Sequence, residues 1–356
     1  MLEIDGSYGE GGGQILRTSV ALAALQGREL RVVSIRKNRR RPGLSHQHVT
    51  AVRSAAALCG AELEGCHKGS GELVFRPGEI KGGSHSFDVG TAGSLTLVLQ
   101  TLLPILLRTG GTVELVGGSD VKWAPSFEFF DKVFLPQIRR LGARVELSLL
   151  RRGHVPEGGG KLKLEVSPSR LHPLPEPGLS SRGALLSIKG RVHLSQLPDN
   201  IAERITRKAR TVLWKELSWP GLKHSDIHIT TSWEEGNPGC GLTLWAEFEN
   251  TRLGYGLSGE KGLSSERLAW MVATTLATEL RSGATVDEWS SDQIFPYLVC
   301  LPLINGDSLP ASGFREPGPS PIFFVRKMSQ HLRTIIWVLE QFGLQPGQEI
   351  GERPRD

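Results

Sequence analysis

The chain has 356 residues, of which 39% are hydrophobic and 22% are charged, so it has the composition of a globular protein. Its longest apolar stretch, Leu95–Leu107, is interrupted by polar residues and Pro104, and its N-terminus has no apolar signal segment. We therefore expect no membrane association and a location in the cytoplasm, or in the nucleus where there is one. A net charge of +5 weakly favours a polyanionic partner, and four scattered cysteines without a Cys-x-x-Cys pair argue against a cysteine zinc site.

A pattern of short strand, buried helix, second strand and amphipathic helix is repeated loosely three times. In the first unit, LEIDGS precedes helix Gly13–Leu25, strand Leu30–Ile35 and helix His46–Cys59. In the second, HSFDVGTAG precedes helix Ser94–Leu107, strand Thr112–Val116 and helix Phe127–Leu141. In the third, TVDEWSSDQ precedes helix Gln293–Leu303, strand Ile322–Val325 and helix Ser329–Phe342.

A region of different character separates the second and third units. Prolines between residues 168 and 177 are typical of a linker. The periodicity then predicts strand Leu185–Leu194, helix Ile201–Leu217, and strands Ile227–Trp233 and Leu242–Phe248. We predict an α/β (α+β) fold with a large domain of residues 1–180 and 258–345, a small α+β domain of residues 181–257 inserted before the third unit, and a C-terminal tail of residues 346–356. The stretch 309–321 is predicted to be a loop.

A glycine-rich stretch, Gly9–Gly13, comes just before the first predicted helix. Its free N–H groups and the helix N-terminus would attract an anion, although a flexible turn is the simpler interpretation. The stretch fits neither the dinucleotide-binding nor the Walker A pattern. Glu10 would repel a phosphate directly, which suggests a divalent metal ion between the two. Arg17, one turn into the helix, could point to the same place or lie exposed.

Five basic residues follow the strand Leu30–Ile35 within the stretch 36–41. Such a run usually belongs to a solvated loop. Arginines at a strand end that faces a cleft would instead suit bidentate phosphate binding.

Among ten histidines, His331 is the preferred candidate nucleophile. It follows Ser329, a plausible N-cap, so it would lie in a first helical turn where the helix dipole would lower its pKa and favour the neutral imidazole. His46 and His48, at another helix start, are the rival candidates. Trp289 and Pro125 could enclose a purine ring, although core packing is the better interpretation of Trp289 from its residue type alone.

Several motifs together resemble the RNA 3'-terminal phosphate cyclases, in matching order from about residue 2 to residue 345. They are GEGGGQILR (Gly9–Arg17), SIRKNRRRPGL (Ser34–Leu44), the pair Gln47-His48, GTAGSLTLVLQT (Gly90–Thr101), RGHVPEGGG (Arg152–Gly160) and DEWSSDQ (Asp287–Gln293). The resemblance implies the same three-unit fold with an inserted small domain. It also implies the reaction: a histidine takes AMP from ATP, AMP passes to an RNA 3'-phosphate, and the 2'-hydroxyl closes a 2',3'-cyclic phosphate and expels AMP.

The resemblance also implies roles for individual residues. His331 would carry AMP, and Glu10 would bind a divalent metal ion, Mg²⁺ or Mn²⁺. Trp289, at a position that is usually tyrosine, would stack on adenine opposite Pro125. Further nucleotide contacts would come from Gln100, Ser290, Ser291, Asp292 and Gln293. Phosphates of ATP and RNA would be bound by Arg17, Arg36, Arg39 and Gln47.

Three alternatives are open. A branch of the same superfamily consists of non-enzymatic ribosome-assembly factors that lack the histidine. Enolpyruvyl transferases share the repeated architecture, but the motifs here do not fit them. A plain RNA-binding protein would use the positive charge but leaves the glycine stretch and DEWSSDQ unexplained.

Overall fold

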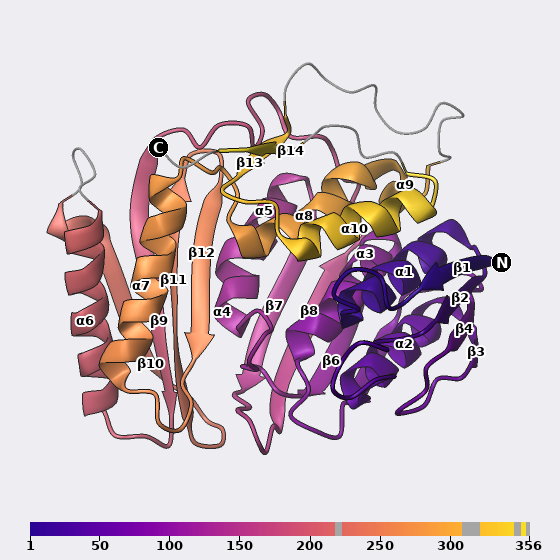
Figure 1. Ribbon diagram of the computed structural model, residues 1–356, viewed down its shortest axis with the longest axis horizontal. Coiled ribbons are helices and arrows are strands. Elements are labelled where there is room, and N and C mark those ends of the chain that lie inside the picture. The colour runs from indigo at the N-terminus through magenta and orange to yellow at the C-terminus, as the bar shows by residue number, and fades with distance from the viewer. Residues whose placement is uncertain (218–222, 308–320, 345–349, 354–356) are drawn as a thin grey trace.

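The computed structural model describes residues 1–217, 223–307, 321–344 and 350–353. Its described residues form three four-stranded sheets and one two-stranded sheet, with helices packed between them (Figure 1). This mixed α/β architecture confirms the predicted fold class. Within the described ranges, none of the helices has both the length and the apolar character that a bilayer span requires.

The first unit contains two helices and one sheet of four strands. Its elements are β1 (Leu2–Asp5), α1 (Gly13–Gln26), β2 (Leu30–Val33), α2 (His46–Cys59), β3 (Glu62–Glu64) and β4 (Leu73–Arg76). The strand order is β1-β2-β4-β3; β1 and β2 are parallel, and the other pairs are antiparallel. The strands β3 and β4, of three and four residues, were not predicted from the sequence.

The second unit repeats this topology. Its elements are β5 (Ser84–Asp88), α3 (Leu95–Thr109), β6 (Gly111–Gly117), α4 (Phe127–Phe129), a π-helical turn η1 (Phe130–Phe134), α5 (Leu135–Arg140), β7 (Arg144–Arg151) and β8 (Gly160–Ser167). The order β5-β6-β8-β7, again with one parallel and two antiparallel pairs, matches the first sheet. The predicted helix Phe127–Leu141 is therefore present, with a π-helical turn inside it.

The third unit is shorter and differs most from its prediction. It consists of α8 (Glu288–Val299), α9 (Leu301–Asn305), β13 (Phe323–Val325), α10 (Gln330–Gln341) and β14 (Ile350–Glu352). The expected helix Gln293–Leu303 was wrong in both bounds. At the start of α8, Asp287 caps the helix by accepting from the N–H groups of Trp289 and Ser290. At its other end, the helix stops before Pro302. Three residues of the expected tail form β14, parallel to β13. The expected loop 309–321 lies almost wholly outside the described residues.

The inserted region forms a separate sheet with two helices on one side. Its elements are β9 (Leu185–Ser195), α6 (Asn200–Glu216), the 3-10 turn η2 (His224–Asp226), β10 (Ile227–Trp233), β11 (Gly239–Phe248), β12 (Arg252–Ser258) and α7 (Ser265–Arg281). Neither β12 nor α7 was predicted from the sequence, and α7 matters most for the packing. This helix packs on α6, β11 and β12, and its apolar side chains belong to the same core as theirs. We call β9 through α7 the inserted unit.

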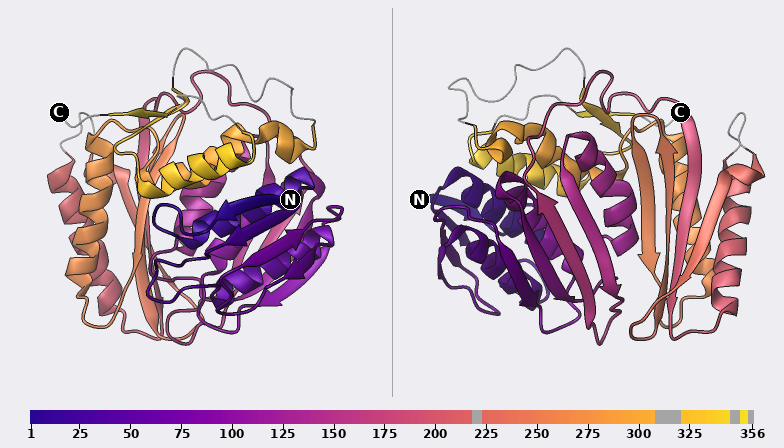
Figure 2. Two further views of the ribbon diagram at one scale, coloured as in Figure 1. Left: turned by 45° about the vertical axis from the view of Figure 1, so that its right-hand side comes forward. Right: turned by 180° about the vertical axis from the view of Figure 1, so that it is seen from behind.

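The described residues form two large hydrophobic cores and a third, small cluster of Phe129, Val133 and Trp245. The larger core joins the three repeated units, with α1 packed on α2, α3 and α10. The smaller core lies between the sheet β10-β9-β11-β12 and the pair α6 and α7. Figures 1 and 2 show the inserted unit beside the second unit, with β12 next to α4 and η1. Within the three repeated units, the N-termini of α1 and α10 lie close together. The predicted site residues lie at this junction.

Candidate functional site

The glycine stretch leads into α1 along a path that ordinary residues could not follow. Gly11 has φ of +55°, in the left-handed region that favours glycine. A Cβ on Gly13 would lie 2.0 Å from His48 Nε2, so the backbone can pass over His48 only without a side chain. Tyr8 stacks on Trp337 of α10, with ring centroids 3.9 Å apart. The residue just before the stretch is thereby packed against α10.

His331 lies where the glycine stretch, α8 and α10 meet. It is the second residue of α10, and the Ser329 hydroxyl caps the helix by accepting from Leu332 N, as predicted. Its Nε2 is 3.2 Å from a carboxylate oxygen of Glu10, and that same oxygen is 3.2 Å from Arg39. Its Nδ1 is 3.7 Å from Asp292 Oδ2, an ion-pair distance. We call Glu10, Arg39, Asp292 and His331 the His331 cluster.

The two carboxylates reverse the expected titration of His331. The neighbouring Asp292 carboxylate, with a smaller contribution from Glu10, raises the pKa of His331 above its usual value of 6.5, while partial burial opposes this change. The predicted lowering by the helix dipole was therefore wrong in direction. A dipole at a helix N-terminus is a partial charge, and two nearby full negative charges outweigh it.

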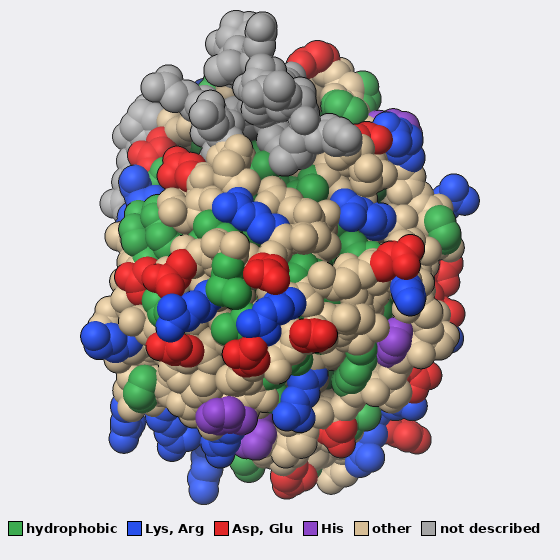
Figure 3. Space-filling model, turned by 90° about the vertical axis from the view of Figure 1, so that its right-hand side faces the viewer, with side chains coloured by type: hydrophobic (Ala, Val, Ile, Leu, Met, Phe, Trp, Pro, Cys, Tyr) green, Lys and Arg blue, Asp and Glu red, His purple; other side chains and the backbone are tan. Residues whose placement is uncertain are grey.

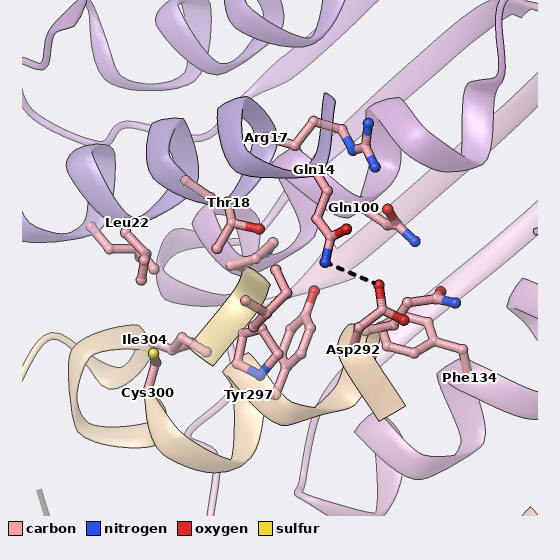
Figure 4. A pocket seen from close by; sticks show the side chains of 16 residues that line it. Gln14, Arg17, Thr18, Leu22, Gln100, Phe134, Asp292, Tyr297, Cys300 and Ile304 are labelled. Carbon is pink, nitrogen blue, oxygen red and sulfur yellow. Dashed lines mark hydrogen bonds between the residues drawn. The ribbon is translucent and has the colours of Figure 1, made fainter. Parts of the chain in front are cut away.

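A pocket opens beside the His331 cluster, between α1, α3, α8 and α10. Its polar part brings together the predicted residues Arg17, Gln100, Asp292 and Gln293, and its other side is apolar, with Leu22 and Ile304 (Figure 4). Burial lowers the pKa of Arg17 to about 10, and the charge of Asp292 partly offsets this effect. The buried Nε of Arg17 has no hydrogen-bond partner among the described residues, so this guanidinium can still bind an oxygen ligand.

Gln14 is a site residue that the sequence analysis did not select. Its amide nitrogen donates to the His331 backbone carbonyl at 2.6 Å and to Asp292 at 3.4 Å. Figure 4 shows Gln14 and Asp292 pointing toward each other from α1 and α8. Gln14 thereby links the starts of three elements of the site. The only signal in the sequence was its place directly after the glycines.

The rival histidines occupy different positions at the start of α2. His48 is buried, and its Nδ1 lies 2.9 Å from the Ser45 hydroxyl and 3.2 Å from Ser45 N in a capping box. Burial, together with the charges of Arg17 and Arg36, lowers the pKa of His48 to about 3. His46 is exposed at the first position of α2. His48 therefore has a packing and capping role beneath Gly13.

Other predicted phosphate ligands have partners within the protein. Arg36 donates to the Gly43 carbonyl at 2.9 Å, and burial followed by repulsion from Arg39 lowers its pKa. Gln47 accepts from the backbone N–H of Ser94 at 3.0 Å, which ties the start of α2 to the start of α3. Among the arginines of residues 36–41, Arg39 is the one that belongs to the His331 cluster.

The remaining nucleotide candidates lie around the start of α8. Ser290 and Ser291 are buried; their hydroxyls donate to Asp287 and to the Glu288 carbonyl. Trp289 is partly buried against Phe129, Val133 and Trp245 and tilts over Tyr255, with centroids 4.2 Å apart. Pro125 is partly buried, and its carbonyl accepts from Thr96. The Gln293 amide nitrogen donates to the Trp289 carbonyl, which leaves its buried oxygen without a partner in the described structure.

A divalent metal ion near Glu10 would need ligands from a bound phosphate. Glu10 is a half-exposed carboxylate, and it belongs to no group of three potential metal ligands among the described residues. A single carboxylate combined with substrate phosphates and water is a common way to bind Mg²⁺. The position of Glu10 fits that arrangement and does not fit a metal site made by protein ligands alone.

Surface charge is mostly mixed on the outer face of the first unit. Arg31 pairs there with Glu3 and Glu72, and Arg76 with Glu64. Figure 3 shows this alternation, and it also shows Lys and Arg side chains gathered along one lower edge. Exposed pairs of this kind contribute little to binding a polyanion, because their charges cancel locally.

These features define a mixed α/β protein of repeated units, with a half-exposed histidine, two carboxylates and an arginine at a junction of helices. The chain belongs to the RNA 3'-terminal phosphate cyclase family, which it matches over residues 8–345.

Curated relatives carry the same family name. The chain is 42% identical to an RNA 3'-terminal phosphate cyclase of Methanopyrus kandleri, over 96% of this chain and 93% of the relative. It is 42% identical to one of Nitrosospira multiformis, over 96% and 91%, and 45% identical to one of Sulfurisphaera tokodaii, over 83% and 86%.

Proposed function

We propose that this protein uses ATP to convert an RNA 3'-terminal phosphate to a 2',3'-cyclic phosphodiester, with His331 as the nucleophile that carries AMP. The observation that carries the proposal is the position of His331, half-exposed between two carboxylates with one ring nitrogen facing each. Family membership and the names of the relatives support the reaction class.

The two ring nitrogens would have different roles in the first step. Asp292 favours a proton on Nδ1, so the lone pair is left on Nε2. Nε2 attacks the α-phosphorus of ATP, a phosphorus–nitrogen bond forms, and pyrophosphate leaves. Because the carboxylates raise the pKa of His331, this step should accelerate as pH rises and the imidazole loses its second proton.

Two transfers to RNA would follow. An oxygen of the RNA 3'-phosphate attacks the phosphorus of the AMP group, and the bond to His331 breaks. The 2'-hydroxyl oxygen then attacks the 3'-phosphorus, loses its proton, and expels AMP as the ring closes. A phosphate monoester is a poor electrophile, and the attached AMP supplies the missing leaving group.

Substrate binding would use the polar side chains that surround the pocket and the glycine stretch. Arg17, Arg36 and Arg39 would bind phosphates, helped by Gln47. Gln100, Asp292 and Gln293 would contact the nucleotide, while the serines at 290 and 291 would hold the start of α8 in place. Trp289 and Pro125 would enclose the adenine. Glu10 would hold a divalent ion, Mg²⁺ or Mn²⁺, whose charge offsets that of the phosphates.

The test is to incubate the purified protein with α-labelled ATP and Mg²⁺ or Mn²⁺ and to separate it under denaturing conditions. Label should stay on the wild-type chain, resist alkali and be released by acid. The matched control is His46→Ala, which removes another exposed histidine from a first helical turn and should retain the label. Retention of label by His331→Ala would disprove the assignment.

The RNA step needs separate substrates. A labelled chain should be discharged by RNA with a 3'-phosphate and should yield a cyclic end. An RNA whose last sugar lacks the 2'-hydroxyl should accept AMP but release no cyclic product. Failure of the wild-type chain to take label with either metal, combined with intact RNA binding, would favour the non-enzymatic ribosome-assembly function instead.

A further inference from the structure

A second group of ionisable side chains lies buried between the second unit and the inserted unit. Asp120 follows β6, His154 follows β7, and His193 lies within β9. These residues are 2%, 4% and 1% exposed. One potential ligand atom from each lies within 4.8 Å of the others, and this is the one such group within the described part of the chain.

The atoms that converge there lack partners. Asp120 Oδ1, His154 Nε2 and His193 Nε2 are buried without a hydrogen bond in the described structure. A buried polar atom that makes no hydrogen bond destabilises the folded state. Several such atoms facing one point are therefore unfavourable unless a ligand is bound by them together.

The surrounding side chains orient these atoms. Asp120 Oδ2 accepts from Arg152 at 2.8 Å and from the Ser119 hydroxyl at 2.7 Å, which leaves Oδ1 to face His193 Nε2 at 3.6 Å. On the other side of the ring, Glu128 lies 3.4 Å from His193 Nδ1. A carboxylate behind an imidazole is the usual support for a metal-bound histidine, because it fixes the ring and the position of its proton.

The local charge also favours a cation. Arg152 is fully buried and contacts three carboxylates, those of Asp120, Glu128 and Glu234. With neutral histidines, the group therefore carries an excess of two negative charges.

We propose that Asp120, His154 and His193 bind a zinc ion that joins the inserted unit to the second unit. Two imidazole nitrogens and one carboxylate oxygen form a donor set that zinc prefers. Tetrahedral bonds of about 2.0–2.1 Å place ligand atoms roughly 3.4 Å apart, close to the 3.6 Å between Asp120 and His193. Water would supply the fourth ligand. No sequence pattern indicated the group, because its members are 34 and 39 residues apart.

The test measures bound metal in the full chain. The protein carries Glu10→Gln throughout, so that a metal ion bound with nucleotide at the His331 cluster does not contribute. After exposure to zinc and dialysis, the protein should retain one zinc ion per chain by mass spectrometry. Asp120→Asn and His193→Gln should each lose it. The control His228→Gln, which changes an exposed histidine of the same unit, should retain it.

Cobalt substitution and thermal unfolding give independent readouts. Co²⁺ should produce the intense visible absorption of a tetrahedral site in the Glu10→Gln protein, in which Asp120, His154 and His193 are all unchanged. A chelator should lower the melting temperature by several degrees in that background and not in Asp120→Asn. The proposal fails if the cobalt spectrum is absent, or if zinc content is the same in every variant. It also fails if a chelator leaves the melting temperature unchanged.

Discussion

The His331 cluster and the group around Arg152 contain the same kinds of side chain, namely histidine, two or more carboxylates and an arginine. They differ in contact with water. The side chains of His331 and Glu10 are 53% and 42% exposed, whereas those of Arg152 and Asp120 are 0% exposed. The same functional groups therefore form one cluster that can rearrange around a ligand and another that is fixed in place.

Solvation decides how each histidine titrates. At the exposed cluster, the carboxylates control the outcome and raise the pKa of His331. At the buried group, the loss of solvation dominates and lowers the pKa of His154 to about 4, although Asp120 is nearby. A list of neighbouring charges does not predict a histidine's behaviour unless the burial of the ring is also known.

The largest expected effect is the loss of adenylylation in His331→Ala. Removing a covalent nucleophile should reduce labelling by a factor on the order of 10⁴ or more. Because the ring is half-exposed, the free energy of unfolding should change by less than about 0.5 kcal/mol. Labelling and urea denaturation of the same preparation check both statements. A parallel loss of stability would mean that the residue supports the fold.

A large effect on stability is expected from Arg152→Met. The change leaves Asp120 and Glu128 buried without their cation, which should lower the free energy of unfolding by about 3–5 kcal/mol in urea denaturation. The matched change Arg39→Met removes an exposed partner of Glu10 and should cost about 0–1 kcal/mol. An equal decrease in the free energy of unfolding for the two variants would show that the two clusters do not differ in solvation.

Most of the fold was predictable because it is encoded locally. Period-matched apolar patterns located α1, α2 and α6 to within a residue or two of their ends. The start of α8 was missed because Asp287 was not identified as its cap, and α7 was overlooked altogether. The strands β3 and β4 were missed, with three and four residues, and so were β7, β8 and β12, with seven or eight residues each.

The candidate site was predictable only in part. The motifs placed His331, Glu10, Arg17 and Asp292 on the list, and the structure brings them to one junction. Gln14 was missed because its partners lie 278 and 317 residues away. The raised pKa of His331 could not be predicted either, since it depends on two carboxylates that meet the ring only in the folded chain.

A smaller effect, on pH dependence, is expected from Asp292→Asn. The carboxylate raises the pKa of His331, so in the wild type the neutral nucleophile becomes abundant only above the usual value of 6.5. Without this charge, the rising limb of the labelling rate should move to lower pH. Single-turnover labelling across a pH series measures this shift. The control Glu340→Gln, at an exposed position of α10, the helix that contains His331, should leave the rising limb at its wild-type pH. An unshifted limb in Asp292→Asn would mean that Asp292 does not control this proton.

The smallest expected effect comes from Gln14→Leu, and it has an unusually close control. Gln14 and Gln26 lie at opposite ends of α1. The Gln14 amide donates to the backbone carbonyl of His331, at the start of α10, at 2.6 Å. The Gln26 amide donates to the backbone carbonyl of Phe342, directly after α10, at 3.1 Å. Either substitution by leucine should cost about 1 kcal/mol of stability.

Only Gln14→Leu should slow labelling, by roughly fivefold to tenfold, because it alone releases the turn that carries His331. Denaturation and single-turnover labelling of both variants separate the two effects. If Gln26→Leu slows labelling equally, the rate depends on the packing of α1 against α10 as a whole. If neither variant slows labelling, then Ser329 and the two carboxylates hold His331 in place without Gln14.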